Sequence, residues 1–367
     1  MNNRIKKIII ATGGTGGHIF PAYSLAKHFV KKKTNVEIIS DKRGLKYLKD
    51  CHDLKIIEIN SSTIFKKNIF QLLFSSLIII YSIFKSFIFL LTNRPNLVFG
   101  MGGYSSFPVC IAATILRIPF IIYENNLYIG KTNRYLLPFT KKIFVSNKAL
   151  EGIPEKYKKK IIEIGNIIRK EILNYQAKSN FNQYEKGLKI LILGGSQAAK
   201  IFAEKLPEIF KECHEAKISL KIYQQCLPEQ NEFLNSFYKN LNIDFEIFNF
   251  SNNILDYFSK INLAITRSGS SMLAELINAR IPFISIPLPS AADNHQLKNA
   301  IYYQKNGYSY LIEEKDLSAK LFKLIKKIYE DRSLLNQMIM KQRQYSDKSV
   351  YENIDKQINK IINHEEH

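Results

Sequence analysis

The sequence predicts an α/β protein made of two Rossmann-like domains with parallel sheets, on three observations. Short β-rich apolar runs alternate with helix-length segments along the whole chain, which is typical of strands joined by crossover helices. The pattern starts twice in the same way, because residues 7–14 and 189–196 are each an apolar run that enters a glycine turn. A chain of 367 residues is also too long for one compact core. We therefore expect domains at 1–165 and 166–367, facing each other across a cleft.

The expected strands follow the apolar runs in chain order. In the first domain they are residues 6–11, 36–40, 56–59, 97–99, 119–123 and 143–145. In the second domain they are residues 188–193, 220–223, 245–248, 263–266, 282–286 and 308–312. The last segment, 350–363, has the apolar spacing of an amphipathic helix, and we expect it to pack back on the first domain.

Charge and cysteine usage narrow the class of protein. The formal net charge of +21 favours an anionic membrane surface or a phosphorylated substrate, although AT-biased coding would also enrich Lys, Asn and Ile. No basic helix interleaved with aromatic residues is present, so nucleic acid is not an expected partner. The four cysteines lack CxxC or metal-like spacing, and no apolar signal-peptide segment opens the sequence. These features indicate a reducing cytoplasm.

The most informative motif is Gly13-Gly14-Thr15-Gly16-Gly17-His18, which follows the first expected strand. Glycine tolerates positive φ and lets backbone N–H groups approach a bulky anion, and the next helix points its positive end at the same place. The motif matches neither a Walker A loop nor the dinucleotide fingerprint. We predict a diphosphate-binding turn with His18 at its edge; a plain glycine turn in an α/β domain is the alternative.

Residues 69–91 form an apolar segment long enough to cross a bilayer. Crossing is not expected, because the segment lies between two strands of one sheet. Its helix would carry a polar stripe made of Gln71, Ser75, Ser82, Lys85 and Ser86. The remaining apolar arc is wider than one packing face needs, and Lys66, Lys67 and Arg94 flank it. This pattern favours a helix at an anionic membrane interface, with burial inside the protein as the alternative.

Other polar and glycine-rich turns follow strands in both domains. Arg267-Ser268-Gly269 precedes a helix that contains Glu275, which favours an anion site beside a carboxylate for ribose hydroxyls. A glutamate that only stabilises the helix dipole is the alternative. Residues 194–197 open another helix, and 293–300 offer side-chain amides to sugar hydroxyls. Residues 100–104 form a third glycine turn, and Glu124-Asn125-Asn126 end a strand.

In this order, these motifs resemble those of the MurG family of bacterial N-acetylglucosaminyltransferases over nearly the whole chain. The resemblance implies a GT-B fold and an inverting transfer of N-acetylglucosamine from UDP-N-acetylglucosamine to the C4 hydroxyl of the muramyl sugar of lipid I, which gives lipid II. It places the donor mainly on the C-terminal domain and lipid I on the N-terminal domain. It also implies a peripheral enzyme on the cytoplasmic face of the inner membrane, with cell-wall synthesis proteins as further partners. Alternatives are a related transferase with another lipid acceptor and a non-catalytic UDP-sugar-binding membrane protein.

The resemblance also assigns roles to residues. The candidate general base is His18, and the donor-binding residues it implies are Thr15, Gly16, Gly17, Asn126, Arg169, Ser196, Ser251, Ser270, Ser271, Met272, Leu273, Ala274, Glu275 and Gln296. The acceptor-binding residues it implies are Gly102, Gly103, Tyr104 and Glu124. We expect no cofactor and no metal, because the sequence has no Asp-x-Asp pair to hold Mg²⁺.

Four positions depart from the family pattern. Ala198 stands where glycine is usual and Ser251 where an apolar residue is usual, so both put donor contacts in doubt. Tyr123 replaces a usual histidine, and Ile167 replaces a usual proline. None of these changes removes a group to which we assign chemistry.

Overall fold

The computed structural model describes residues 6–49, 53–61, 69–175, 187–249, 251 and 253–363. It divides the chain into two compact units: unit 1 is Met1–Lys170 with Asp347–His367, and unit 2 is Glu171–Ser346. The first boundary therefore follows Lys170, whereas the sequence placed it after residue 165. The chain also returns to unit 1 at Asp347, so the C-terminal segment is not part of unit 2.

Unit 1 is built on a sheet of seven parallel strands in the order β3-β2-β1-β4-β5-β6-β7. The strands are β1 (Lys7–Ala11), β2 (Asn35–Ser40), β3 (Lys55–Glu58), β4 (Leu97–Gly100), β5 (Phe120–Glu124), β6 (Lys142–Val145) and β7 (Ile161–Glu163). Its helices are α1 (Gly16–Lys31), α2 (Lys42–Leu48), α3 (Ile69–Thr92), α4 (Ser106–Ile115), α5 (Lys131–Leu136) and α14 (Val350–Asn363). All six expected strands form, and β7 was missed because three residues are too short to show a period.

Unit 2 repeats this plan with six parallel strands in the order β10-β9-β8-β11-β12-β13. The strands are β8 (Leu188–Leu193), β9 (Leu220–Gln225), β10 (Asp244–Phe248), β11 (Leu263–Thr266), β12 (Phe283–Ser285) and β13 (Tyr310–Leu311). The helices are α6 (Lys170–Leu173, which starts on the last residue of unit 1), α7 (Gly195–Glu215), α8 (Asn231–Asn240), α9 (Leu255–Phe258), α10 (Ser270–Asn278), α11 (His295–Lys305), α12 (Leu317–Glu330) and α13 (Ser333–Arg343). Both units reverse strand order beside their first strand, as doubly wound Rossmann sheets do, which confirms the predicted fold class.

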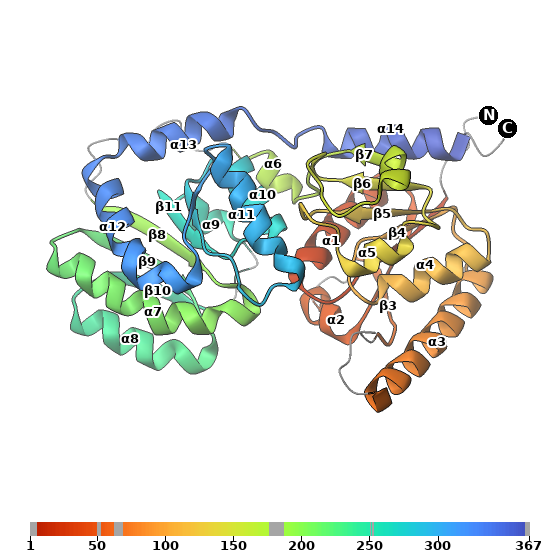
Figure 1. Cartoon of the computed structure of the whole chain (residues 1–367), viewed down its shortest axis with the longest axis horizontal. Helices are drawn as coiled ribbons and strands as arrows, with labels where there is room; N and C mark the ends of the chain where they lie inside the picture. Colours follow the sequence, from red (N-terminus) through yellow and green to blue (C-terminus); the bar gives the residue numbers. More distant parts are fainter. Residues whose placement is uncertain are drawn as a thin grey trace. The chain divides into compact units, whose positions relative to one another are not determined.

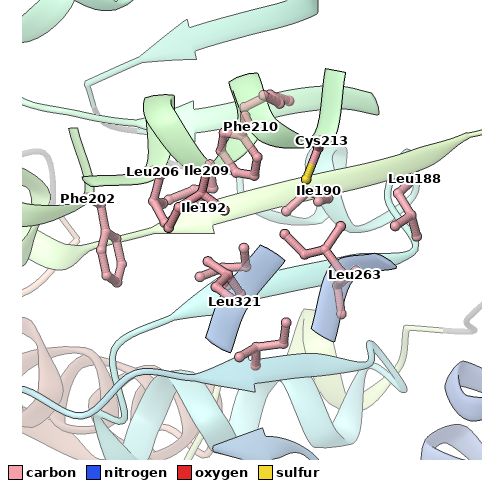
Figure 2. Packing of buried hydrophobic residues seen from close by; sticks show 14 of the residues in the cluster. Leu188, Ile190, Ile192, Phe202, Leu206, Ile209, Phe210, Cys213, Leu263 and Leu321 are labelled. Carbon is pink, nitrogen blue, oxygen red and sulfur yellow. The ribbon is translucent and has the colours of Figure 1, made fainter. Parts of the chain in front are cut away.

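The core of unit 2 forms where the apolar side of β8 packs against the apolar side of α7. Alternate residues of β8, Leu188, Ile190 and Ile192, lie in one buried cluster with a single face of α7 (Figure 2). That face repeats every fourth residue, as Phe202, Leu206 and Phe210. The strand period of two and the helix period of 3.6 therefore place apolar side chains in one layer between α7 and the sheet.

Helix α14 belongs to unit 1, where Figure 1 shows it in blue near β7. α14 and Asp347, which precedes it, bond to residues 166–168, near the end of the first stretch of unit 1. The Tyr351 hydroxyl donates to the Ile168 carbonyl at 2.7 Å, and Asp347 accepts from the Asn166 backbone N–H at 2.8 Å. The buried His28 of α1 bonds to Asp355 at 3.0 Å. The chain passes from one unit to the other after Lys170 and again before Asp347. Hydrogen bonds within unit 1 therefore join the segments next to both of these places.

Asp355 makes this anchor dependent on pH. Burial alone would raise the pKa of the Asp355 carboxyl, but hydrogen bonds and charge from His28 and Lys32 lower it overall. A lowered folded pKa means that the stabilisation is complete above the unfolded value, which is near 3.8, and is lost as the pH falls through the folded value. We expect Asp355→Asn to destabilise the protein by about 1–3 kcal/mol at pH 7 and by progressively less below pH 3.8.

Thermal unfolding of both proteins between pH 7 and pH 2.5 measures this difference. Asp316→Asn is a matched control, because Asp316 pairs with Lys320 at the surface and an exposed pair contributes little. An Asp355→Asn effect that stays constant across this pH range would contradict the prediction.

Most of the polar stripe of helix α3 faces the protein interior, although polar side chains usually face solvent. Three of the five stripe residues, Ser75, Ser82 and Ser86, face inward with 2%, 1% and 2% of their surface exposed. Ser82 donates to the Asn60 carbonyl and Ser86 to the Ser82 carbonyl, each at 2.7 Å. Small side chains let α3 lie close against α4, as Figure 1 shows for the orange helices of unit 1.

The apolar arc of α3 consequently points outward. Phe74, Leu77 and Phe84 have 67%, 65% and 61% of their surface exposed. Other large side chains of this face, which we call the α3 apolar face, are Phe70, Leu73, Ile80, Tyr81, Ile88 and Leu91. By length and composition α3 could cross a membrane, and only 22% of its most apolar window is buried. Burial within the protein, the alternative for this segment, applies only to the inner side of α3, where Leu90 lies in the core. Lys66 and Lys67 lie outside the described residues.

Candidate functional site

The glycine turns after β1 and β4 touch backbone to backbone at one edge of the unit 1 sheet. β1 and β4 are paired neighbours, so their carboxyl ends lie side by side. Gly103 has a φ of +78°, and a Cβ there would stand 2.3 Å from the Gly13 carbonyl oxygen. The Ser105 hydroxyl donates to the Thr12 carbonyl at 2.6 Å and closes the second side of the contact. Only glycine fits positions where two main chains approach this closely.

His18 lies where these two turns meet. It is the third residue of α1, and its ring covers Gly102, which has a φ of +86°. A Cβ on Gly102 would lie 2.8 Å from the His18 Nδ1 atom. The first turn of α1 contains no acidic residue, and Thr15 and Gly17 are exposed. The structure therefore brings together the predicted residues Thr15, Gly16, Gly17, His18, Gly102, Gly103 and Tyr104 on unit 1.

Glu124 is a buried carboxylate that organises the end of β5. One oxygen accepts from the Asn126 backbone and side-chain amides at 3.1 and 3.0 Å. The other accepts from the Gly130 N–H at 2.8 Å and from Asn133 at 3.0 Å. Both oxygens are thus engaged inside unit 1, and Glu124 fixes the orientation of Asn126. An acceptor contact by Glu124 stays a prediction.

Two residues of this region were not singled out from the sequence. The Asn125 side chain donates to the Gly17 carbonyl at 3.0 Å and ties β5 to the first glycine turn. Asn133 holds Glu124 from α5, nine residues along the chain. Asn125 was visible in the motif Glu124-Asn125-Asn126, whereas Asn133 lies within a helix and shows no sequence signal.

Two of the four departures from the family pattern contact each other. The buried Tyr123 hydroxyl accepts from the Ile167 N–H at 3.0 Å and lies 3.4 Å from the Gly165 carbonyl oxygen. Burial raises the pKa of the Tyr123 phenol, so the phenol stays neutral. A proline at position 167 would have no backbone N–H, whereas Ile167 has one that needs an acceptor. Tyr123 supplies the acceptor that this extra donor requires.

Arg169 lies on unit 1, directly after this contact. The sequence assigned residues 166–367 to the C-terminal domain, but the division after Lys170 places Arg169 with the N-terminal one. Both neighbours of Arg169 contact other residues of unit 1. The Ile168 carbonyl accepts from the Tyr351 hydroxyl, and Lys170 Nζ lies 3.0 Å from His28 Nδ1. Its predicted contact with the donor stays a prediction.

Unit 2 presents a second polar edge at the start of α10. Gly269 precedes the helix in an extended conformation, and a Cβ on it would meet no atom within 4 Å. The first turn of α10 has no acidic residue, and the positive end of the helix dipole lies at this edge. Ser271 and Met272 are half-buried, Glu275 is buried within the helix, and Leu273 and Ala274 lie in the core.

Gln296 connects this helix start to a neighbouring loop. Its side-chain oxygen accepts from the Ser268 N–H at 3.2 Å and from the Leu288 N–H at 3.0 Å. Asn299 donates to the Ser268 carbonyl at 3.2 Å. Arg267 is buried and donates to the Pro287 carbonyl at 3.1 Å. With its oxygen engaged, Gln296 can offer a ligand only its NH₂ group.

The remaining predicted donor residues are Ser270, Ser251 and Ser196, all on unit 2. Ser270 is buried in the first turn of α10, and Ser251 is half-buried after β10. α7 starts at Gly195, but the Ser196 and Ala198 side chains lie outside the described residues. Among the residues that the structure describes, no group of three or more His, Cys, Asp or Glu side chains is placed to hold a metal.

Family models match both halves of the chain. The N-terminal domain of glycosyltransferase family 28 matches residues 8–145, and its C-terminal domain matches residues 189–357. These two ranges contain the glycine turns of unit 1 and the α10 edge of unit 2, so the geometry described above falls inside the matched domains.

Relatives and solved structures match over nearly the full length. The chain is 36% identical over 362 residues to the UDP-N-acetylglucosamine--N-acetylmuramyl-(pentapeptide) pyrophosphoryl-undecaprenol N-acetylglucosamine transferase of Pelagibacter ubique, covering 98% of this chain and 99% of that one. The Rickettsia bellii protein of the same name is 37% identical over 89% of this chain and 90% of its own length. The crystal structure of Acinetobacter baumannii MurG aligns with a TM-score of 0.76 and 25% identity over 97% of this chain and 99% of its own length.

Proposed function

The chain belongs to glycosyltransferase family 28, and from that premise we propose that it transfers N-acetylglucosamine from UDP-N-acetylglucosamine to the muramyl sugar of an undecaprenyl-diphosphate-linked acceptor. The names of relatives that match almost all of this chain state this donor and acceptor. The observation that carries the proposal is the position of the His18 ring over Gly102, where two glycine turns meet. This arrangement brings a base to the edge of a backbone cradle suited to a diphosphate.

His18 acts in this proposal as the general base. The C4 hydroxyl of the acceptor sugar attacks C1 of N-acetylglucosamine, and His18 accepts the hydroxyl proton as the new bond forms. UDP leaves from the opposite side, so the anomeric centre inverts. Only the neutral form of the imidazole can accept this proton.

The donor diphosphate and ribose are assigned to unit 2. The positive end of α10 stabilises the charge that develops on the leaving UDP, because this helix end is fixed before the reaction starts. Glu275 is the candidate partner of the ribose hydroxyls and Gln296 of the sugar. On unit 1, the donor-binding roles of Thr15, Gly16, Gly17, Asn126 and Arg169 stay predictions.

Attachment to the cytoplasmic face of the membrane completes the proposal. The acceptor carries a polyprenyl chain that stays in the bilayer, so the enzyme must work at the lipid surface. The α3 apolar face offers large exposed side chains on unit 1, the unit that carries the proposed acceptor turns. Such a face binds an interface by burying apolar area, with cationic side chains attracting anionic lipid.

UDP release tests the function directly. The full chain is incubated with UDP-N-acetylglucosamine and a short-chain analogue of the lipid-linked acceptor, in detergent with EDTA. We expect release that requires the analogue and persists in EDTA. Binding of UDP-N-acetylglucosamine without any release would favour another acceptor or a non-catalytic role.

A further inference from the structure

The segment Asp41-Lys42-Arg43-Gly44 is a polar motif that the proposed function leaves unused. It follows β2, which pairs with β1, so it emerges beside the Gly13–Gly17 turn at the same edge of the sheet. Gly44 brings α2 close to this edge, because a Cβ there would stand 2.2 Å from the Ser40 hydroxyl and 2.6 Å from Ile19. The motif therefore lies directly against the predicted diphosphate turn.

Asp41 places a buried negative charge beneath that turn. Its side chain is 5% exposed, and one oxygen accepts from the Gly14 and Gly44 N–H groups at 3.1 and 2.9 Å. The other accepts from Ser61 at 2.8 Å and from Arg43 at 2.9 Å. Burial would raise the pKa of Asp41, but these four hydrogen bonds lower it overall, so the carboxyl stays charged near neutral pH. One N–H of the turn is thus already used, and the charge below it opposes an anion.

Arg43 resolves this conflict. Its NH2 atom is held by Asp41 and lies 3.9 Å from the place a Cβ would take on Gly14. The side chain is 58% exposed, and Asp41 is its hydrogen-bond partner among the residues that the structure describes. A guanidinium is a planar fork with five N–H donors, so one contact to Asp41 leaves donors that match diphosphate oxygens. Arg43 neutralises Asp41 and presents positive charge above the turn.

We propose that Arg43 binds a diphosphate at the Gly13–Gly17 turn and that Asp41 is the positioning residue that holds its guanidinium there. This inference rests on the proposed function, which involves two diphosphates, one in the lipid-linked acceptor and one in UDP-N-acetylglucosamine. Both share the chemistry that the turn and Arg43 recognise, and the experiment distinguishes the two sources.

The test compares Arg43→Gln with Lys46→Gln. Lys46 is exposed on the same helix, so both variants remove one positive charge from α2. We expect Arg43→Gln to raise the KM of one diphosphate substrate about tenfold or more with little change in kcat, because a charge-assisted contact is lost. Arg43→Lys should restore part of that loss, and Lys46→Gln should leave both KM values within about twofold. A rise for the acceptor assigns the subsite to the lipid-linked diphosphate, and a rise for the donor assigns it to UDP.

A binding measurement separates this inference from the proposed function. Titration calorimetry with a short-chain polyprenyl diphosphate and with UDP needs no turnover, so it tests Arg43 even if no sugar is transferred. Weaker binding of one probe by Arg43→Gln alone supports the subsite, with melting temperatures confirming that the variants are folded. Equal affinities in all three proteins, an equal loss in both variants, or no binding of either probe by the unaltered chain would overturn it.

Discussion

Replacing His18 by alanine should lower kcat by roughly 10²–10⁴-fold, the range typical of removing a general base. The reason is geometric, since the His18 ring covers Gly102 at the place where the glycine turns after β1 and β4 meet. The substitution removes the proton acceptor and leaves both turns, because Gly102 and Gly103 gain space and no new contact. We expect the affinity for UDP, measured by titration, to change little.

The measurement is the steady-state rate of UDP release with saturating substrates. His214→Ala is a suitable control, because His214 is an exposed histidine in the last turn of α7 and has no place in the proposed chemistry. Partial recovery of His18→Ala by added imidazole would support the role of base specifically. A rate near that of the unaltered protein would exclude His18 from catalysis.

Replacing Leu77 and Phe84 together by glutamine should lower partitioning onto anionic vesicles by roughly 100-fold. Burying a large apolar side chain is worth about 1.5–3 kcal/mol, and the two side chains are 65% and 61% exposed in the free protein. Half of the full value from each side chain totals about 1.5–3 kcal/mol, and the upper part of that range corresponds to roughly 100-fold. The fold should persist, because both side chains point away from Ser75, Ser82 and Ser86, which form the inner side of α3.

Vesicle co-sedimentation measures this partitioning. The matched control is Phe233→Gln with Met340→Gln, which removes two large apolar side chains of similar exposure, 52% and 65%, from helices of unit 2. We expect the control to bind vesicles like the unaltered protein, and both double variants to keep their activity on a water-soluble acceptor. Equal binding by all three proteins would show that the α3 apolar face is not the membrane contact.

Much of the architecture could be predicted from the sequence, because its signals are local. Apolar runs such as residues 188–193 are long and regular, so all twelve expected strands form. Glycine turns are also readable, since Gly102 and Gly103 adopt the positive φ values that only glycine tolerates easily. β7 was missed, because a three-residue strand has no period to detect. The division after Lys170 lies five residues beyond the expected boundary after residue 165.

Pairings between distant residues could not be read in this way. Tyr123 and Ile167 each looked like an isolated departure, but they form a donor and acceptor pair across 44 residues. The stripe on α3 was visible, yet periodicity shows only that one side of a helix differs from the other. Which side of the helix faces the protein depends on the elements packed against it. Here α3 packs against α4, and Ser82 on its inner side donates to the Asn60 carbonyl.

The sequence by itself therefore determined the α/β class, the positions of twelve strands and the positions of the glycine turns, because backbone preference and apolar period act over a few residues. Only the tertiary structure decided that the His18 ring lies on Gly102 and that Asp41 accepts from the Gly14 N–H. These are contacts between segments that lie far apart in the chain. They form because the carboxyl ends of neighbouring parallel strands meet at one edge of a sheet, wherever those strands stand in the sequence.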